Sequence, residues 1–137
     1  MKELTLCAET ENLDHLIEFI NALLEEKNCP MYKVMELDIA VEELFVNIAH
    51  YAYKPNRGDT TIQIDFEEEY VIITFMDGGI PYNPWEREDP DTTLSLEERK
   101  IGGLGVFMVK NSMDEVGYRH EDGKNVVTIK KNISNQG

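Results

Sequence analysis

Three glycines stand within four positions, Gly102, Gly103 and Gly105, directly before an apolar segment with helical spacing. Glycine lets a backbone approach a ligand closely, and the first turn of a helix offers unpaired N–H groups at the positive end of its dipole. The segment can therefore bind an anion, although a hinge or a tight helix entry would explain the glycines equally well. It is not a P-loop, because no Gly-Lys-Ser/Thr follows.

A second group of polar residues, Glu43, Asn47 and His50, follows helical spacing of four and three residues. The amide oxygen of Asn47 can coordinate Mg²⁺, which prefers oxygen ligands, and Glu43 can accept a proton from an attacking hydroxyl. The alternative is that Glu43 and Asn47 lie on a solvated helix face. His50 is interpreted as a surface or packing residue.

The third group is Asp77-Gly78-Gly79, which directly follows a predicted strand. A carboxylate at the end of a strand can accept a hydrogen bond from an exocyclic amine, and Gly79 lets a flat base lie against the backbone. A simple β-turn would account for the same three residues.

These groups depend on elements that the periodicity of the chain predicts. Strands are expected at residues 2–9, 60–66, 70–76, 116–120 and 125–131, and helices at about 13–27, 31–53 and 104–114. The second helix should face the core with Val34, Leu37, Val41, Leu44, Phe45 and Ile48. Residues 77–100 hold three of the five prolines and form a long loop, of a length that is usually functional. The element order predicts an α+β sandwich with helices on one face of a largely antiparallel sheet.

Composition limits the classes of function. The 137 residues are expected to form one domain, 1–137, and the 27 acidic against 13 basic residues give a formal charge of −14. Such a charge disfavours nucleic acid and anionic membranes as partners. The two cysteines lack the spacing of a zinc site, and no signal peptide or membrane-spanning run is evident, so a cytoplasmic protein is expected.

Taken together and in this order, the three groups resemble the nucleotide site of the GHKL (Bergerat-fold) ATPases. Residues 43–47 resemble the N box of that family, residues 77–79 its first glycine box and residues 102–105 its second. Within it, the runs AVEE…N…HYAY, DGGIPYNP and GGLG…MDEV are similar to bacterial anti-sigma-factor serine/threonine kinases. The resemblance covers about residues 36–130. It implies a two-layer sandwich with helices on one face of a mixed, mostly antiparallel sheet.

The resemblance implies a role for each matching residue. Glu43 would be the general base, and Asn47 would hold Mg²⁺. The ATP-binding residues would be Asn47, Asp77, Gly79, Gly102, Gly103, Leu104, Gly105 and Thr128. Among these, Asp77 would bind the adenine amine, and Thr128, in the last strand, would place a hydroxyl near adenine.

The implied activity is phosphorylation, with ATP and Mg²⁺, of a STAS-type anti-sigma antagonist, together with sequestration of a sigma factor, usually as a homodimer. The sequence departs from many relatives at Asn83, where they have aspartate, and in an acidic run that comprises Glu86, Glu88, Asp89 and Asp91. Acidity there opposes closure over a triphosphate. The alternative is therefore a binding module that nucleotide switches, with little or no phosphoryl transfer.

Overall fold

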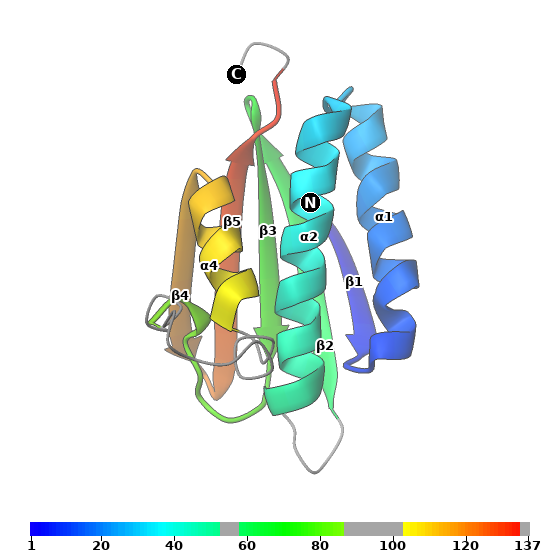
Figure 1. Ribbon diagram of the computed structural model, residues 1–137. Helices are drawn as coiled ribbons and strands as arrows, with labels where there is room; N and C mark the ends of the chain where they lie inside the picture. Colours follow the sequence, from blue (N-terminus) through cyan, green and yellow to red (C-terminus); the bar gives the residue numbers. More distant parts are fainter. Residues whose placement is uncertain (53–57, 87–102, 135–137) are drawn as a thin grey trace.

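A five-stranded sheet forms one layer of the computed structural model, which describes residues 1–52, 58–86 and 103–134 (Figure 1). Its strands run in the order β1-β2-β3-β5-β4, and every pairing among them is antiparallel, so the sheet is not mixed. The strands are β1 (Lys2–Cys7), β2 (Asp59–Glu67), β3 (Tyr70–Asp77), β4 (Glu115–Glu121) and β5 (Lys124–Asn132).

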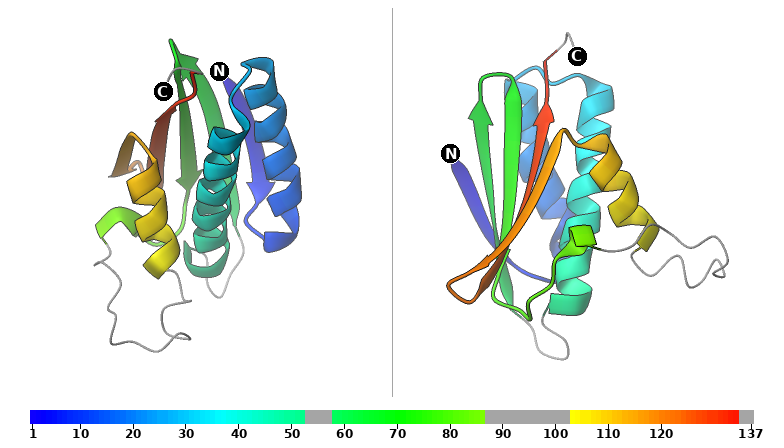
Figure 2. Two further views of the ribbon diagram at one scale, coloured as in Figure 1. Left: turned by 45° about the horizontal axis from the view of Figure 1, so that its top comes forward. Right: turned by 90° about the vertical axis from the view of Figure 1, so that its left-hand side faces the viewer.

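Three helices form the second layer, and all of them cover the same face of the sheet (Figure 2). They are α1 (Leu13–Glu26), α2 (Met31–Asn47) and α4 (Gly103–Ser112). Two 3₁₀ turns, η1 (Thr10–Asn12) and η3 (Pro84–Glu86), and the π-helical turn η2 (Ile48–Ala52) complete the described elements. The predicted α+β sandwich with helices on one face is confirmed.

The core lies between these layers because the helical and strand periodicities both bring apolar side chains to it. On α1, Leu16, Ile20 and Leu24 are completely buried at spacings of four residues. On α2, the predicted stripe is buried from Leu37 to Phe45, whereas Val34 at its start is partly buried. Each such side chain stabilises the fold by about 1.5–3 kcal/mol relative to an exposed one.

Strand β3 carries the alternation that positions one end of the site. Val71, Ile73 and Phe75 are buried on the helix-facing side, and the same period of two brings Asp77 to that side at the end of the strand. Asp77 pairs in register with Thr60 of β2 and with Asn125 of β5. A carboxylate therefore ends an otherwise apolar row.

The end of α2 differs from the prediction of one continuous helix over residues 31–53. The α-helix ends at Asn47, and residues 48–52 form the π-helical turn η2. Single π-helical turns are rare, and they occur frequently at functional sites. The change of helix type falls next to two of the residues singled out by the sequence.

The connections follow ordinary turn chemistry where they are described. The β4–β5 hairpin turns at Asp122 and Gly123, both with positive φ, as a two-residue hairpin requires. Residues 78–86 of the predicted long loop are described and include η3. Gly102 and residues 87–101 lie outside the described residues. Among the described helices, none is both long and apolar enough to cross a bilayer.

Candidate functional site

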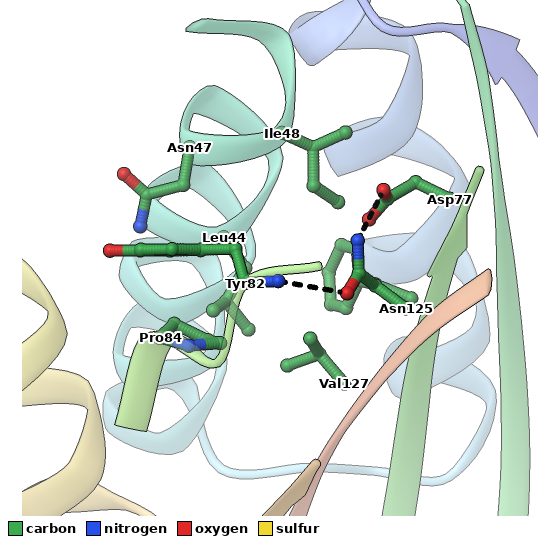
Figure 3. A pocket seen from close by; sticks show the side chains of 9 residues that line it. Leu44, Asn47, Ile48, Asp77, Tyr82, Pro84, Asn125 and Val127 are labelled. Carbon is green, nitrogen blue, oxygen red and sulfur yellow. Dashed lines mark hydrogen bonds between the residues drawn. The ribbon is translucent and has the colours of Figure 1, made fainter. Parts of the chain in front are cut away.

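A pocket opens between the C-terminal end of α2 and the adjoining ends of β3 and β5 (Figure 3). It contains about 380 Å³ of empty space, including space open to solvent. Its lining residues are Leu44, Asn47, Ile48, Phe75, Asp77, Tyr82, Pro84, Asn125 and Val127. The predicted polar residues Asn47 and Asp77 thus share one cavity, although they come from different elements.

Asp77 is held rigidly at the floor of this pocket. Its side chain is 4% exposed, and its Oδ1 atom accepts hydrogen bonds from the Gly79 backbone N–H and from Asn125 Nδ2, both at 3.0 Å. The first of these bonds turns the loop after β3 back over the carboxylate, as in a turn. Gly79 therefore lies beside Asp77, but among Asp77, Gly78 and Gly79 only Asp77 lines the pocket.

Asn125 is a site residue that the sequence analysis missed. Its carboxamide is 2% exposed and donates from Nδ2 to Asp77 Oδ1 and to the Ile80 carbonyl oxygen, at 3.0 and 2.8 Å. Its Oδ1 accepts from the Tyr82 backbone N–H at 3.1 Å and from the Tyr118 hydroxyl. One side chain thus connects β3, the loop after it and β4. No signal in the sequence identifies it, because its role depends on the pairing of β3 with β5.

Replacement of Asn125 by alanine is expected to lower the free energy of unfolding by about 2–4 kcal/mol, because one buried and three partly buried hydrogen bonds would be lost at once. Chemical denaturation measures this loss. Hydrogen exchange of the Tyr82 amide should also accelerate. The exposed helix residue Asn111 supplies the control, since its replacement by alanine should change neither quantity. Slow exchange at Tyr82 in the Asn125 variant would show that the loop does not depend on this side chain.

Asn47, the last residue of α2, reaches the pocket from the side opposite Asp77 (Figure 3). It is 7% exposed, and its Nδ2 atom is buried without a hydrogen-bond partner among the described residues. A buried polar atom without a partner is costly and rare, and it indicates a missing ligand or water. The alternative of a solvated helix face is therefore wrong for Asn47. The unpartnered Nδ2 fits a hydrogen-bond acceptor on a ligand, such as a phosphate oxygen, and the amide oxygen of the same side chain can coordinate a hard cation.

Glu43 lies one helical turn before Asn47 and is half-buried. It faces Gly105 in the first turn of α4, so closely that a Cβ atom on Gly105 would overlap the Glu43 carboxylate. Glycine at this position leaves room for the Glu43 carboxylate, which a larger side chain would displace. The first turn of α4 offers backbone N–H groups that have no partner within the helix. The structure thus brings Glu43 and the start of α4 together.

The remaining predicted residues take different places. Gly103 and Leu104 open α4, and Gly102 lies outside the described residues. His50 is exposed in η2 and does not line the pocket. Thr128 requires a correction. Val127 and Ile129 face the helices, and Thr128 points to the opposite face of the sheet, where it lines a separate hollow.

The pocket has the chemistry of a site for a flat, amine-bearing base. Apolar side chains from α2, β3 and β5 form its walls, and a buried carboxylate lies at its floor. A buried acceptor of this kind selects a ligand that can donate to it, because any other ligand would leave it unsatisfied. The start of α4 supplies amides that attract anions without adding positive charge to the protein.

Comparisons with known proteins agree with this fold. A family model described as the histidine kinase-like ATPase domain matches residues 6–131. The chain is similar to proteins named serine-protein kinase RsbW. The relative from Bacillus mycoides is 27% identical over 104 residues, which cover 69% of this chain and 62% of the relative. The one from Bacillus cereus is 28% identical over 101 residues, which cover 71% and 63%. The match thus spans less than two thirds of these relatives.

Two solved structures show the same fold at low sequence identity. The catalytic domain of histidine kinase ThkA superposes with a TM-score of 0.54 at 15% identity, over 97% of this chain and 98% of that one. The histidine kinase AdeS of Acinetobacter baumannii gives 0.51 at 13% identity, over 98% of this chain and 70% of that one.

Proposed function

Because the chain belongs to the family of histidine kinase-like ATPase domains, we propose that it binds Mg·ATP in the pocket between α2 and the sheet and transfers the γ-phosphoryl group to a protein serine or threonine. The observation that carries this proposal is the convergence of Asn47 and Asp77, from separate elements, on one cavity. The relatives named as serine-protein kinases support the choice of a protein hydroxyl as acceptor.

The adenine end of the ligand would be held by Asp77. Since Oδ1 of this carboxylate already accepts from Asn125 and Gly79, the exocyclic amine would donate to Oδ2. The apolar walls that include Leu44 and Val127 would enclose the two faces of the base. Guanine carries a carbonyl oxygen at the corresponding position, which would face the carboxylate unfavourably, so adenine is the base that this arrangement favours.

The phosphate end would be held by Asn47 and the start of α4. Asn47 would hold Mg²⁺ through its amide oxygen, and the ion supplies neutralisation of phosphate charge at that point. The backbone N–H groups of Gly103, Leu104 and Gly105 would donate to phosphate oxygens, and Gly102 would belong to the same loop. These amides attract the anionic phosphates, whereas the net charge of −14 repels them.

Glu43 would act on the acceptor. Its carboxylate lies beside the start of α4, which is where the terminal phosphate would be placed, and it would accept the proton of the attacking hydroxyl. The hydroxyl oxygen then forms the new bond to phosphorus as ADP leaves. The close approach of Gly105 would limit the positions that this carboxylate can take.

Replacement of Gly105 by alanine is expected to slow phosphoryl transfer roughly 10- to 100-fold with the fold retained, because the new methyl group displaces the Glu43 carboxylate. Alanine favours a helix by about 1 kcal/mol over glycine, so circular dichroism should show no loss of structure. Gly117→Ala is the matched control, since its Cβ would lie 4.0 Å from Thr128 Cβ, an ordinary contact. In a Glu43→Gln background the Gly105 change should add little, and an additive effect would argue against this coupling.

The protein substrate and the regulatory partners are proposed from the family resemblance. We infer a STAS-type anti-sigma antagonist as the phosphoryl acceptor, a sigma factor as the sequestered protein, a homodimer as the assembly and the bacterial cytoplasm as the location. Incubation with γ-labelled ATP and a STAS-domain protein tests the activity, with the acceptor serine replaced by alanine as the control. Label on the unmodified partner alone is the expected result.

The alternative is a module that nucleotide switches without transferring phosphate. The acidic run that begins at the exposed Glu86 favours it. In that case the STAS protein stays unlabelled while ATP still changes its affinity for the chain, as titration calorimetry would detect.

A further inference from the structure

The outer face of α2 exposes large apolar side chains far from the nucleotide pocket. Met31, Tyr32, Met35 and Ile39 are 71%, 57%, 59% and 52% exposed, and they follow a spacing that gathers them on one side of the helix. They are four of the seven large apolar residues that are exposed in the described part of the chain. A contiguous apolar group of this kind on a surface marks an interaction site more often than scattered residues do.

Helix α4 extends this group. The helices α2 and α4 lie side by side (Figure 1) and pack against each other. The two helices run antiparallel. Gly105 at the start of α4 faces Glu43, which is near the end of α2. At the other end of α4, Lys131 Nζ contacts both the Ser112 carbonyl oxygen and Glu36, which is nearer the start of α2. This register brings Met108, which is 54% exposed, to the level of Ile39. We call Met31, Tyr32, Met35, Ile39 and Met108 the α2 face.

The charges around the α2 face are mostly negative, although α4, which carries Met108, has the exposed Lys110 as its one charged residue. Helix α2 carries four acidic residues and one lysine, and residues 13–47 together carry eight acidic residues and two lysines. The lysine of α2, Lys33, is 5% exposed and donates to the Ser134 carbonyl oxygen, so it offers little positive charge to a partner. Glu42 is exposed one helical turn after Ile39, and Glu36, which is partly exposed, lies one turn before it. The apolar strip thus has an acidic border.

We propose that the α2 face docks an amphipathic helix of a partner protein, with an apolar stripe bordered by lysine or arginine. Apolar side chains at one- and two-turn spacing match the anchors of a docked helix, and methionine adapts to varied partner shapes. The acidic border selects a basic partner and disfavours a second copy of this strongly anionic chain.

The α2 face is separate from the nucleotide site along the same helix. Met31 opens α2 and Asn47 ends it, which corresponds to about 24 Å along the helix axis. Ile39 lies about 12 Å before Asn47, and Met108 lies within one helical turn of Gly105, so a partner that docks at the Met31 end of the α2 face leaves the pocket accessible. This inference does not depend on the proposed kinase activity, since it follows from exposure and charge alone.

The test uses the full chain and two labelled helical peptides of about 18 residues, with the same leucine stripe but bordered by lysine in one and by glutamate in the other. Fluorescence anisotropy should show the lysine-bordered peptide binding at least about tenfold more tightly, with this preference reduced at high salt. The double variant Met35→Ser/Ile39→Ser should weaken that binding at least about tenfold, because two apolar anchors are lost.

The matched control is Ile80→Ser, which removes an apolar side chain of similar exposure, 62%, from the loop near the pocket. It should bind the peptide as the unmodified chain does. Equal binding by the double variant would overturn the assignment of the α2 face. A dimer of the unmodified chain that is absent from the double variant in sedimentation would also overturn it. That result would identify a second copy as the occupant.

Discussion

Replacement of Asn47 by alanine is expected to weaken binding of Mg·ATP at least about 100-fold without unfolding the protein. The side chain lines the pocket, and its buried Nδ2 has no partner among the described residues. Its removal therefore breaks no described hydrogen bond at that atom, and alanine favours the helix. Asn47 is buried, so the fold is expected to be retained because its Nδ2 makes no described hydrogen bond that the variant would lose.

Titration calorimetry measures this effect, and two comparisons make it specific. Asn21→Ala removes a carboxamide from α1 whose Oδ1 is likewise buried without a partner, and it should leave nucleotide affinity unchanged. ADP in the presence of a chelator should bind the Asn47 variant nearly as well as it binds the unmodified protein, since the adenine pocket is intact. Unchanged affinity for Mg·ATP in the variant would remove Asn47 from the site.

Replacement of Glu43 by glutamine is expected to slow phosphoryl transfer by about 10²–10⁴-fold, which is the usual contribution of a general base. Glutamine keeps the size of the side chain, so the approach of Gly105 and α4 should be preserved. Nucleotide affinity should change little. Single-turnover transfer of labelled phosphate at saturating ATP separates the chemical step from binding.

The neighbouring residue Glu42 provides the control for this variant. It is exposed on the same helix, and Glu42→Gln makes the same change of charge away from α4. Its transfer rate should match that of the unmodified protein. If the Glu43 variant transferred phosphate at the normal rate, the carboxylate would have only a structural role beside Gly105.

Much of the fold was predictable because it depends on local periodicity. Alternation in residues 70–76 placed β3, and the apolar stripe from Leu37 to Phe45 placed α2 with its core face correctly oriented. The end of α2 was not predictable in the same way. An α-helix and a π-helical turn share similar residue preferences, and the packing around residues 48–52 decides between them.

The site was predicted in part, for reasons that differ from residue to residue. Asp77 could be found because it continues the inward row of its own strand. Asn125 could not be found in this way, since its role depends on the pairing of β3 with β5, which joins residues 48 positions apart. Thr128 was placed near the pocket although the face of a strand residue changes at every position, and only the register of β5 determines it.

The amino-acid sequence by itself indicated candidate residues for a nucleotide site, their order along the chain and the elements that carry them, because spacing and residue type are local properties. Tertiary structure alone decided that Asn47 is buried with an Nδ2 that has no partner among the described residues, that Asn125 holds Asp77, and that α4 approaches Glu43 so closely that a side chain at position 105 would displace its carboxylate. Such contacts join segments far apart in the chain, and they form only when the helices pack on the sheet.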